Sequence, residues 1–297
     1  MIQSIDAYLV QLQKELAGRD AALVQDALSD AEEHLRMALQ EQQATRPGES
    51  ESDLLTEIIT KYGLPQEIAM AYIEVEALTM PGLVRSRRKE SQSPLLRFLS
   101  VASDPGAWGA LLYLLLSVVT GMVYFTWTIS GMSLSLSMVL LVIGLPFATL
   151  FLLSIRSIGL VEGRIIEALL GTRMPRRPVF TARGQGVWEQ VKAVFSDGRT
   201  WLTALYMICM LPLGVLYFTV FISLLSLSIS FIAAPILDLV IHEPLIQLGH
   251  TTYYPPAWLM PFVVLGGIII FLATMHLAKA VGKLHASLAK TMLVGGG

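Results

Sequence analysis

Three ionisable residues of one proline-rich stretch, His242, Glu243 and His250, are the side chains of this chain best suited to bind a metal ion. A metal site needs about three or four convergent nitrogen, sulfur or oxygen ligands. Three residues scattered over a loop that also holds Tyr253 and Tyr254 meet this requirement poorly. We therefore predict a partly solvated loop with interfacial tyrosines here, and no metal site.

Two other places hold ionisable side chains suited to chemistry. His34 stands beside Glu32 and Glu33, a set fit for proton transfer, but we expect these residues on a solvated helix without a pocket. Asp238 is the one acidic residue inside an apolar stretch, where ionisable groups often mark functional sites; we place it at the outer interface. With no nucleophile constellation, P-loop or dinucleotide fingerprint, the sequence predicts no catalytic or cofactor-binding residues and no enzyme.

The remaining candidates are a cysteine and two histidines in apolar surroundings. Cys209 is the only cysteine, which excludes an intrachain disulfide and a thiolate metal cluster. His276 and His285 fall near the end of the last apolar stretch, where we assign them ordinary roles at a helix end.

The composition differs between two parts of the chain. Of the 297 residues, 54% are hydrophobic, which places the chain in the membrane class. Residues 1–80 hold 15 acidic and five basic residues, a net charge of −10, whereas the remainder holds eight acidic and 16 basic residues, a net charge of +8. An acidic domain repels nucleic acid, so we expect no direct nucleic-acid binding.

The apolar part repeats itself. A gapless self-alignment at an offset of 93 residues, beginning at Ser103, gives 15 identities in 35 positions. The identities include Asp104 with Asp197, Trp108 with Trp201, Tyr113 with Tyr206, and Gly121 with Gly214. Shared apolar composition explains some matches but not these, because Asp, Trp, Tyr and Gly are uncommon in apolar runs. The sequence therefore predicts a duplicated membrane module.

Apolar residues recur at helical spacing through the acidic domain. The pattern predicts helices over about 2–17 and 20–44, a third that ends at Gly63, and a fourth that Pro65 opens. Short amphipathic helices of this kind bury one modest shared core. We predict a small all-α domain over residues 1–80.

About 20 apolar residues span a bilayer. Four stretches reach this length: 108–127, 133–155, 201–221 and 258–277. A fifth apolar stretch, 222–241, is ambiguous by length alone.

Charge placement decides how the ambiguous stretch is read. The basic residues of the membrane domain fall into three groups, 85–97, 156–199 and 279–290, which the positive-inside rule makes cytoplasmic. A full crossing by 222–241 would leave the last group outside. We therefore predict four spans, a cytoplasmic (inner) membrane location with both termini cytoplasmic, and an outer, partly embedded segment at 222–257.

Each half ends in a similar amphipathic element, 158–170 and 277–288, which we expect along the cytoplasmic face. Gly163 aligns with Gly282 at an offset of 119, so the second copy carries about 26 extra residues. We place these in an outer insertion at about 231–257, and expect it to be the sensing element.

The predicted fold is all-α, with a small helical domain before a polytopic membrane domain. The predicted boundaries are 1–80 for the acidic helical domain, 81–103 for a basic juxtamembrane linker and 104–293 for the membrane domain, with repeats at 104–171 and 197–293.

Residues 5–73 resemble the HAAS domain, a small helical cytoplasmic module. The likeness is carried by Tyr8-Leu9 with Leu12, by Glu33-His34-Leu35 and above all by the run from Lys61 to Ala69, KYGLPQEIA. Members of that family are associated with PadR-type transcription regulators and membrane signalling proteins. The resemblance implies a cytosolic PadR-type partner.

The segment from about 104 to 293 resembles the "putative sensor" membrane domain found at the N-terminus of some bacterial histidine kinases. The matching residues are Trp108 with Tyr113, Gly144-Leu145-Pro146, Glu167 to Gly171, Asp197 with Trp201, and Leu211 to Gly214. No phospho-acceptor helix or glycine-rich ATP-binding segment follows before Gly297, so we expect signalling by contact and not by phosphoryl transfer.

Three function classes stay open. The first is a membrane signalling protein that senses an envelope or lipophilic signal and relays it by contact to a cytosolic regulator. The second is a small transporter or membrane subunit of a transport complex, since parallel repeats also build transporters. The third is a scaffold that anchors the helical domain. Membrane lipids are expected partners, and the sequence is compatible with a homo-oligomer.

Overall fold

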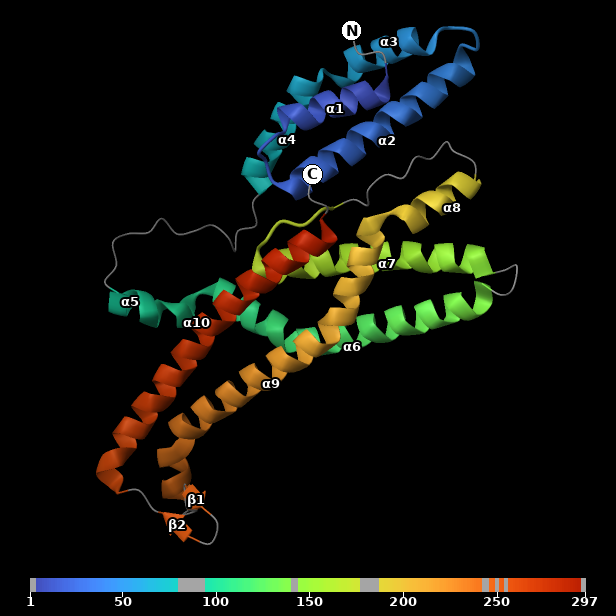
Figure 1. Cartoon of the computed structure of the whole chain (residues 1–297). Coiled ribbons are helices and arrows are strands. Elements are labelled where there is room, and N and C mark those ends of the chain that lie inside the picture. The colour runs from blue at the N-terminus through green and yellow to red at the C-terminus, as the bar shows by residue number, and fades with distance from the viewer. Residues whose placement is uncertain are drawn as a thin grey trace. The chain divides into compact units, whose positions relative to one another are not determined.

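The computed structural model describes residues 4–79, 94–139, 144–176, 187–241, 246–248, 251–253 and 256–294. Its elements are helices apart from one short antiparallel hairpin, which confirms the predicted helical class. Figure 1 labels these elements along the chain, which divides into two compact units. The first holds residues 1–85, 128–206 and 288–297, and the second holds residues 86–127 and 207–287.

Four helices form the N-terminal part of the first unit: α1 (Ile5–Glu15), α2 (Ala21–Thr45), α3 (Glu51–Tyr62) and α4 (Pro65–Thr79). The sequence explains their ends. Ser4 caps α1 by accepting a hydrogen bond from the Ala7 amide at 3.1 Å, and Asp20 caps α2 in the same way. All four helices match the predicted ones to within a few residues.

The turn between α3 and α4 is held by Tyr8 of α1. Gly63 ends α3 with φ of 117°, the left-handed backbone that the sequence predicts there. The Tyr8 hydroxyl donates to the Gly63 carbonyl oxygen at 2.9 Å. Burial, with Tyr62 and Glu67 nearby, raises the pKa of Tyr8, so this hydroxyl stays protonated and available as a donor. The KYGLPQEIA run is thereby tied to the core.

One apolar core joins these helices. Its buried members from all four helices are Tyr8, Leu12, Leu16, Ala27, Ala31, Leu35, Leu39, Leu54, Leu55, Ile58, Ile59 and Ala69. On α2 the core residues 27, 31 and 35 recur every four positions, as a helix facing a single core requires. Ala22 and Leu23 of α2 are equally buried but lie outside this cluster, so α2 buries a second surface.

In the part of the chain that the structure describes, four later helices are long and apolar enough to cross a membrane, which confirms the predicted number of spans. They are α6 (Pro105–Val139), α7 (Gly144–Leu170), α9 (Gly198–Ile241) and α10 (Met260–Leu293). The chain is therefore a multi-pass membrane protein. Shorter elements are α5 (Pro94–Leu99), the 3-10 turns η2 (Ser100–Ser103) and η3 (Ala257–Leu259), α8 (Val187–Ser196), and strands β1 (Ile246–Leu248) and β2 (Thr251–Tyr253).

The boundaries of the spans differ from the predicted ones at two places. The predicted second span, 133–155, is wrong, because α6 continues to Val139 and α7 begins only at Gly144. The predicted span 201–221 is too short for the helix observed, because α9 runs unbroken from Gly198 to Ile241, through the first part of the predicted outer segment at 222–257. Hydropathy does not locate a turn inside an apolar run, and membrane helices tolerate internal proline because neighbouring groups satisfy the freed carbonyls.

The predicted amphipathic elements 158–170 and 277–288 are not separate helices. They are the C-terminal parts of α7 and α10. An apolar stripe that continues one helical period beyond a span has the same pattern as a new surface helix, so the sequence alone does not separate the two.

Within the second unit, α6 and α9 cross with their backbones in contact. A Cβ atom built on Gly121 would lie 2.5 Å from the Met210 carbonyl oxygen, and one built on Gly214 would lie 2.3 Å from the Ser117 carbonyl oxygen. The glycines are 93 residues apart, as are Ser117 and Met210, so the same contact is made twice. Only glycine permits so close an approach at these positions.

Candidate functional site

An ion pair ties α7 to the first turn of α9 in the first unit. The Arg156 guanidinium lies 2.7 Å from Asp197 Oδ2 and donates to Thr200 Oγ1 at 2.7 Å. The other oxygen of Asp197 accepts from the Arg199 amide at 3.1 Å, which caps α9. Because both charges are largely shielded from solvent, the pair fixes the register of α7 against α9.

The second unit repeats this arrangement between α6 and α10. Asp104 accepts from the Gly106 amide at 3.0 Å and pairs with Lys279 of α10. The two aspartates are 93 residues apart, the offset of the sequence repeat. The tryptophans of the repeat match as well: Trp108 donates to the Ala102 carbonyl, and Trp201 donates to the Phe195 carbonyl.

A tyrosine one to two turns further along each repeat contacts a buried ionisable group. Tyr206 donates to Glu162 of α7 at 3.1 Å in the first unit. In the second unit, Tyr113 lies 2.7 Å from His285 Nε2, and Tyr217 lies 3.4 Å from its Nδ1. Glu162 and His285 are 0% and 1% exposed. The expectation of an ordinary helix-end role for His285 is therefore wrong, since the ring is enclosed between two tyrosines.

These contacts correct the predicted offset between α7 and α10. Arg156 corresponds to Lys279 and Glu162 to His285, and both spacings are 123 residues and not 119. The two offsets differ by four residues, about one helical turn. A shift of one turn leaves the apolar residues on the same face of the helix, so an alignment of apolar patterns does not detect it. The second copy accordingly carries 30 extra residues between the part that aligns with α6 and the part that aligns with α7.

A short extended segment, which we call the strap (residues 171–176), leads from α7 to the N-terminal helices in the first unit. Gly171 ends α7 with φ of 68°, a left-handed stop that glycine favours. Met174 is fully buried, and a Cβ atom on Gly163 of α7 would lie 3.2 Å from its Cβ. The strap is thus seated on α7.

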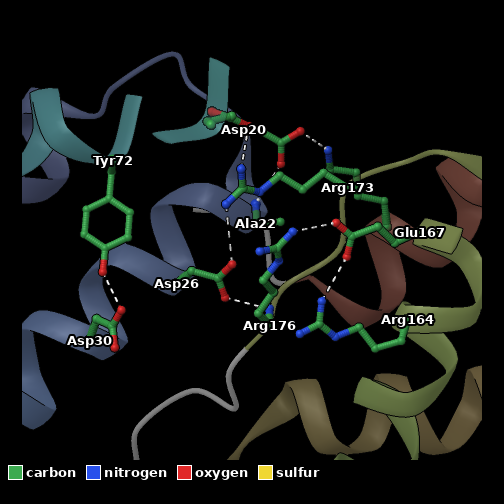
Figure 2. A network of polar contacts seen from close by, with 11 residues as sticks. Asp20, Ala22, Asp26, Asp30, Tyr72, Arg164, Glu167, Arg173 and Arg176 are labelled. Atoms are coloured by element: carbon green, nitrogen blue, oxygen red, sulfur yellow. Dashed lines mark hydrogen bonds and ion pairs between the residues drawn. The ribbon is translucent and has the colours of Figure 1, made fainter. Parts of the chain in front are cut away.

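The other side of the strap contacts α2 and α4 (Figure 2). Arg173 lies between two carboxylates, 2.8 Å from Glu76 Oε1 and 3.6 Å from Asp26 Oδ2. The main-chain amide of Arg176 donates to Asp26 Oδ1 at 2.6 Å. Asp26 is 5% exposed, so the strap supplies a hydrogen-bond donor and an opposite charge to a carboxylate that is shielded from water.

Three further ion pairs complete this contact. Lys290 of α10 lies 2.5 Å from Asp20, the capping residue of α2. Glu167, near the end of α7, is 3.2 Å from both Arg164 and Arg176, so this carboxylate links the strap to α7 (Figure 2). A cavity of about 60 Å³ beside the strap is lined by residues that include Gln25, Arg156, Met174, Asp197 and Leu293. This volume is enough for a few water molecules.

The structure gives mixed outcomes for the residues singled out by sequence. His242, Glu243 and His250 lie outside the described residues. Asp238 falls on α9. His34 stacks on Tyr62, with ring centroids 4.5 Å apart. Among the residues that the structure describes, no group of three His, Cys, Asp or Glu is placed to hold a metal ion.

The contacts that sequence reasoning missed are those of the strap, Asp26 and Glu162. Arg173 and Arg176 were visible only as part of the basic segment 156–199, and Asp26 only as one of 15 acidic residues. The available signal was the pairing of two oppositely charged segments within one chain.

Residues 113–293 match the model of the protein family described as "Putative sensor". This match covers more than half of the chain and includes α7, α9 and α10, the strap and both tyrosine contacts. No curated protein and no solved structure is significantly similar to the chain.

Proposed function

Because the chain belongs to the "Putative sensor" family, we propose that it is a membrane signalling protein whose spanning helices take up a signal and whose N-terminal helices pass it on by contact. The family assignment supports the sensing role. The proposal adds the route and the recipient: the state of the spanning helices reaches the N-terminal domain through α7 and the strap, and from there a cytosolic regulator.

The strap is the observation that carries this proposal. Arg156 and Glu162 of α7 contact α9. At its C-terminal end α7 continues into the strap, where Arg173 forms ion pairs with Asp26 and Glu76. A displacement of α7 against α9 therefore moves the strap and changes its contacts with α2 and α4. Packed interfaces shift between discrete arrangements, which suits a switch.

The recipient is proposed from the resemblance of residues 5–73 to the HAAS domain, which the family match does not cover. The KYGLPQEIA run forms the ordered turn between α3 and α4, where the Tyr8 hydroxyl donates to the Gly63 carbonyl oxygen. The resemblance supports a cytosolic regulator of the PadR type.

The stimulus is proposed to be lipophilic or to come from the envelope. Part of the extra residues of the second copy lies between α9 and α10, where the structure describes the hairpin of β1 and β2. Trp258, just before α10, is 69% exposed. Aromatic and apolar residues at such a place suit the membrane–water boundary, where a lipid or a hydrophobic ligand is met.

The proposed route requires both termini and the strap to be cytoplasmic. In a Cys209→Ser background, an impermeant maleimide applied to intact cells should label a cysteine at Trp258 and leave cysteines at Trp188 and Lys290 unlabelled until the cells are opened. External labelling at Lys290 would contradict the four-span topology.

Regulator binding tests the function. A purified PadR-type regulator from the same organism should bind the full chain in lipid nanodiscs. Tyr206→Phe removes the hydroxyl that donates to buried Glu162, a loss of about 1–3 kcal/mol, and should change the regulator affinity at least about fivefold.

The matched control is Thr149→Ala, which removes a hydroxyl of α7 that bonds only within its own helix. This variant should bind the regulator as the wild type does. Absence of regulator binding to the wild-type chain would refute the recipient, and equal affinities for Tyr206→Phe and Thr149→Ala would refute the route.

A further inference from the structure

Three carboxylates of the N-terminal helices differ from the others in their partners. Elsewhere in the described part of this domain, acidic side chains pair within the domain, as Glu57 does with Lys61 and Arg46. Asp20, Asp26 and Glu76 instead pair with basic residues that lie beyond it: Lys290, Arg173 and Arg176. We call these three residues the acidic face.

The acidic face is built to receive a chain segment. Ala22 and Leu23 are buried on α2 next to Asp26, although they take no part in the core of the domain. One carboxylate oxygen of Asp26 accepts a main-chain amide, and a guanidinium bridges Asp26 and Glu76. A main-chain bond together with an arginine between two carboxylates is how an extended basic peptide is recognised.

The strap has the properties of a ligand for this face. Its sequence, Arg173-Met-Pro-Arg176, places two arginines on either side of an apolar pair. Met174 and Pro175 are buried, the Arg173 guanidinium and the Arg176 main-chain amide reach the acidic face, and the Arg176 guanidinium pairs with Glu167 of α7. Proline stiffens the segment and lowers the entropy lost when it binds.

We propose that the acidic face is the regulator-binding surface, that the regulator presents an extended basic segment of the same chemistry, and that the strap is an internal competitor for it. This inference rests on the proposed function and specifies how it is controlled. While the strap is bound, the acidic face is not accessible to the regulator. When α7 moves and withdraws the strap, the nearly buried carboxylate of Asp26 loses its contacts with the strap. An external basic segment then binds in its place.

Tethering explains why the competitor is effective. A segment joined to its site through a short connection acts at an effective concentration of about a millimolar. A free peptide of similar affinity therefore binds the wild-type chain weakly, and withdrawal of the strap raises its apparent affinity without any new contact.

The test uses the full chain in nanodiscs and a fluorescein-labelled peptide with the sequence of residues 171–176, GTRMPR. Arg173→Glu replaces the bridging guanidinium by a like charge and releases the strap. The peptide should bind this variant about tenfold or more tighter than it binds the wild type. The single variant Asp26→Arg also releases the strap but lacks the carboxylate that accepts the main-chain amide, and it should not bind the peptide.

Two controls isolate the contact. Arg46→Glu changes an exposed arginine just after α2 that pairs with Glu49 and Glu57, and should leave peptide binding at the wild-type level. A peptide with both arginines replaced by glutamate should bind no variant.

Equal peptide affinity for Arg173→Glu and the wild type would overturn the inference, as would binding that survives Asp26→Arg. If the peptide behaves in either way while the regulator still binds the chain and responds to Tyr206→Phe, the proposed function stands and only the competitor is lost. If the regulator itself fails to bind, the proposed function fails first.

Discussion

Gly214→Ala should melt well below the wild-type chain, because one methyl group at this position meets backbone and not a movable side chain. The added Cβ would lie 2.3 Å from the Ser117 carbonyl oxygen, so α6 and α9 must separate. Overpacking of this kind costs about 1–3 kcal/mol, and the loss of helix contact in a membrane adds to it. Thermal unfolding of the purified chain in detergent should show a Tm lower by about 5–10 °C.

The control is Gly266→Ala on α10, where the nearest atom to an added Cβ is 4.0 Å away. Its Tm should remain near that of the wild type. Gly121→Ala should resemble Gly214→Ala, and the double variant should lose less than the sum of the two, because one separation of the helices relieves both clashes. Identical melting of Gly214→Ala and Gly266→Ala would contradict the close crossing.

The N-terminal helices were predicted from the sequence to within a few residues, because the local signals agree. The left-handed Gly63 and the opening Pro65 both lie where the apolar pattern changes. The number of spans was predicted for a similar reason, since basic residues are confined to three segments and allow few arrangements.

The ends of the spanning helices were not predictable in the same way. Inside an apolar run, the chain continues as a helix until a turn is favoured by tertiary contacts, and hydropathy carries no trace of those contacts. The junction before Gly144 and the continuation of α9 past Phe221 are both of this kind.

The polar contacts depend on pairing between distant segments. The repeat predicts that Asp104 and Asp197 have equivalent surroundings, and they do. It does not predict that the first helix of each repeat pairs with the second helix of the other: α9 with Arg156 and Glu162 of α7, and α6 with Lys279 of α10. Burial of Asp26 has no local signature either, because a shielded carboxylate and a solvated one look alike in sequence.

Asp26→Arg should release the N-terminal helices from the strap. The change places a positive charge against Arg173 and removes the acceptor of the Arg176 amide. Breaking a shielded ion pair costs about 3–5 kcal/mol, enough to raise the undocked population more than about a hundredfold. Combining Asp26→Arg with Arg173→Glu restores opposite charges and should recover part of the docking.

The distance between α2 and α8 measures this release directly. Spin labels on cysteines at Met37, which is 56% exposed, and at the exposed Lys192 in a Cys209→Ser background allow double electron–electron resonance in nanodiscs. The control Arg46→Glu keeps the wild-type contacts of the acidic face. The account predicts one narrow distance distribution for the parent chain and for Arg46→Glu, and a broad one for Asp26→Arg. A distribution that is equally narrow in Asp26→Arg, or already broad in the parent chain, would contradict it.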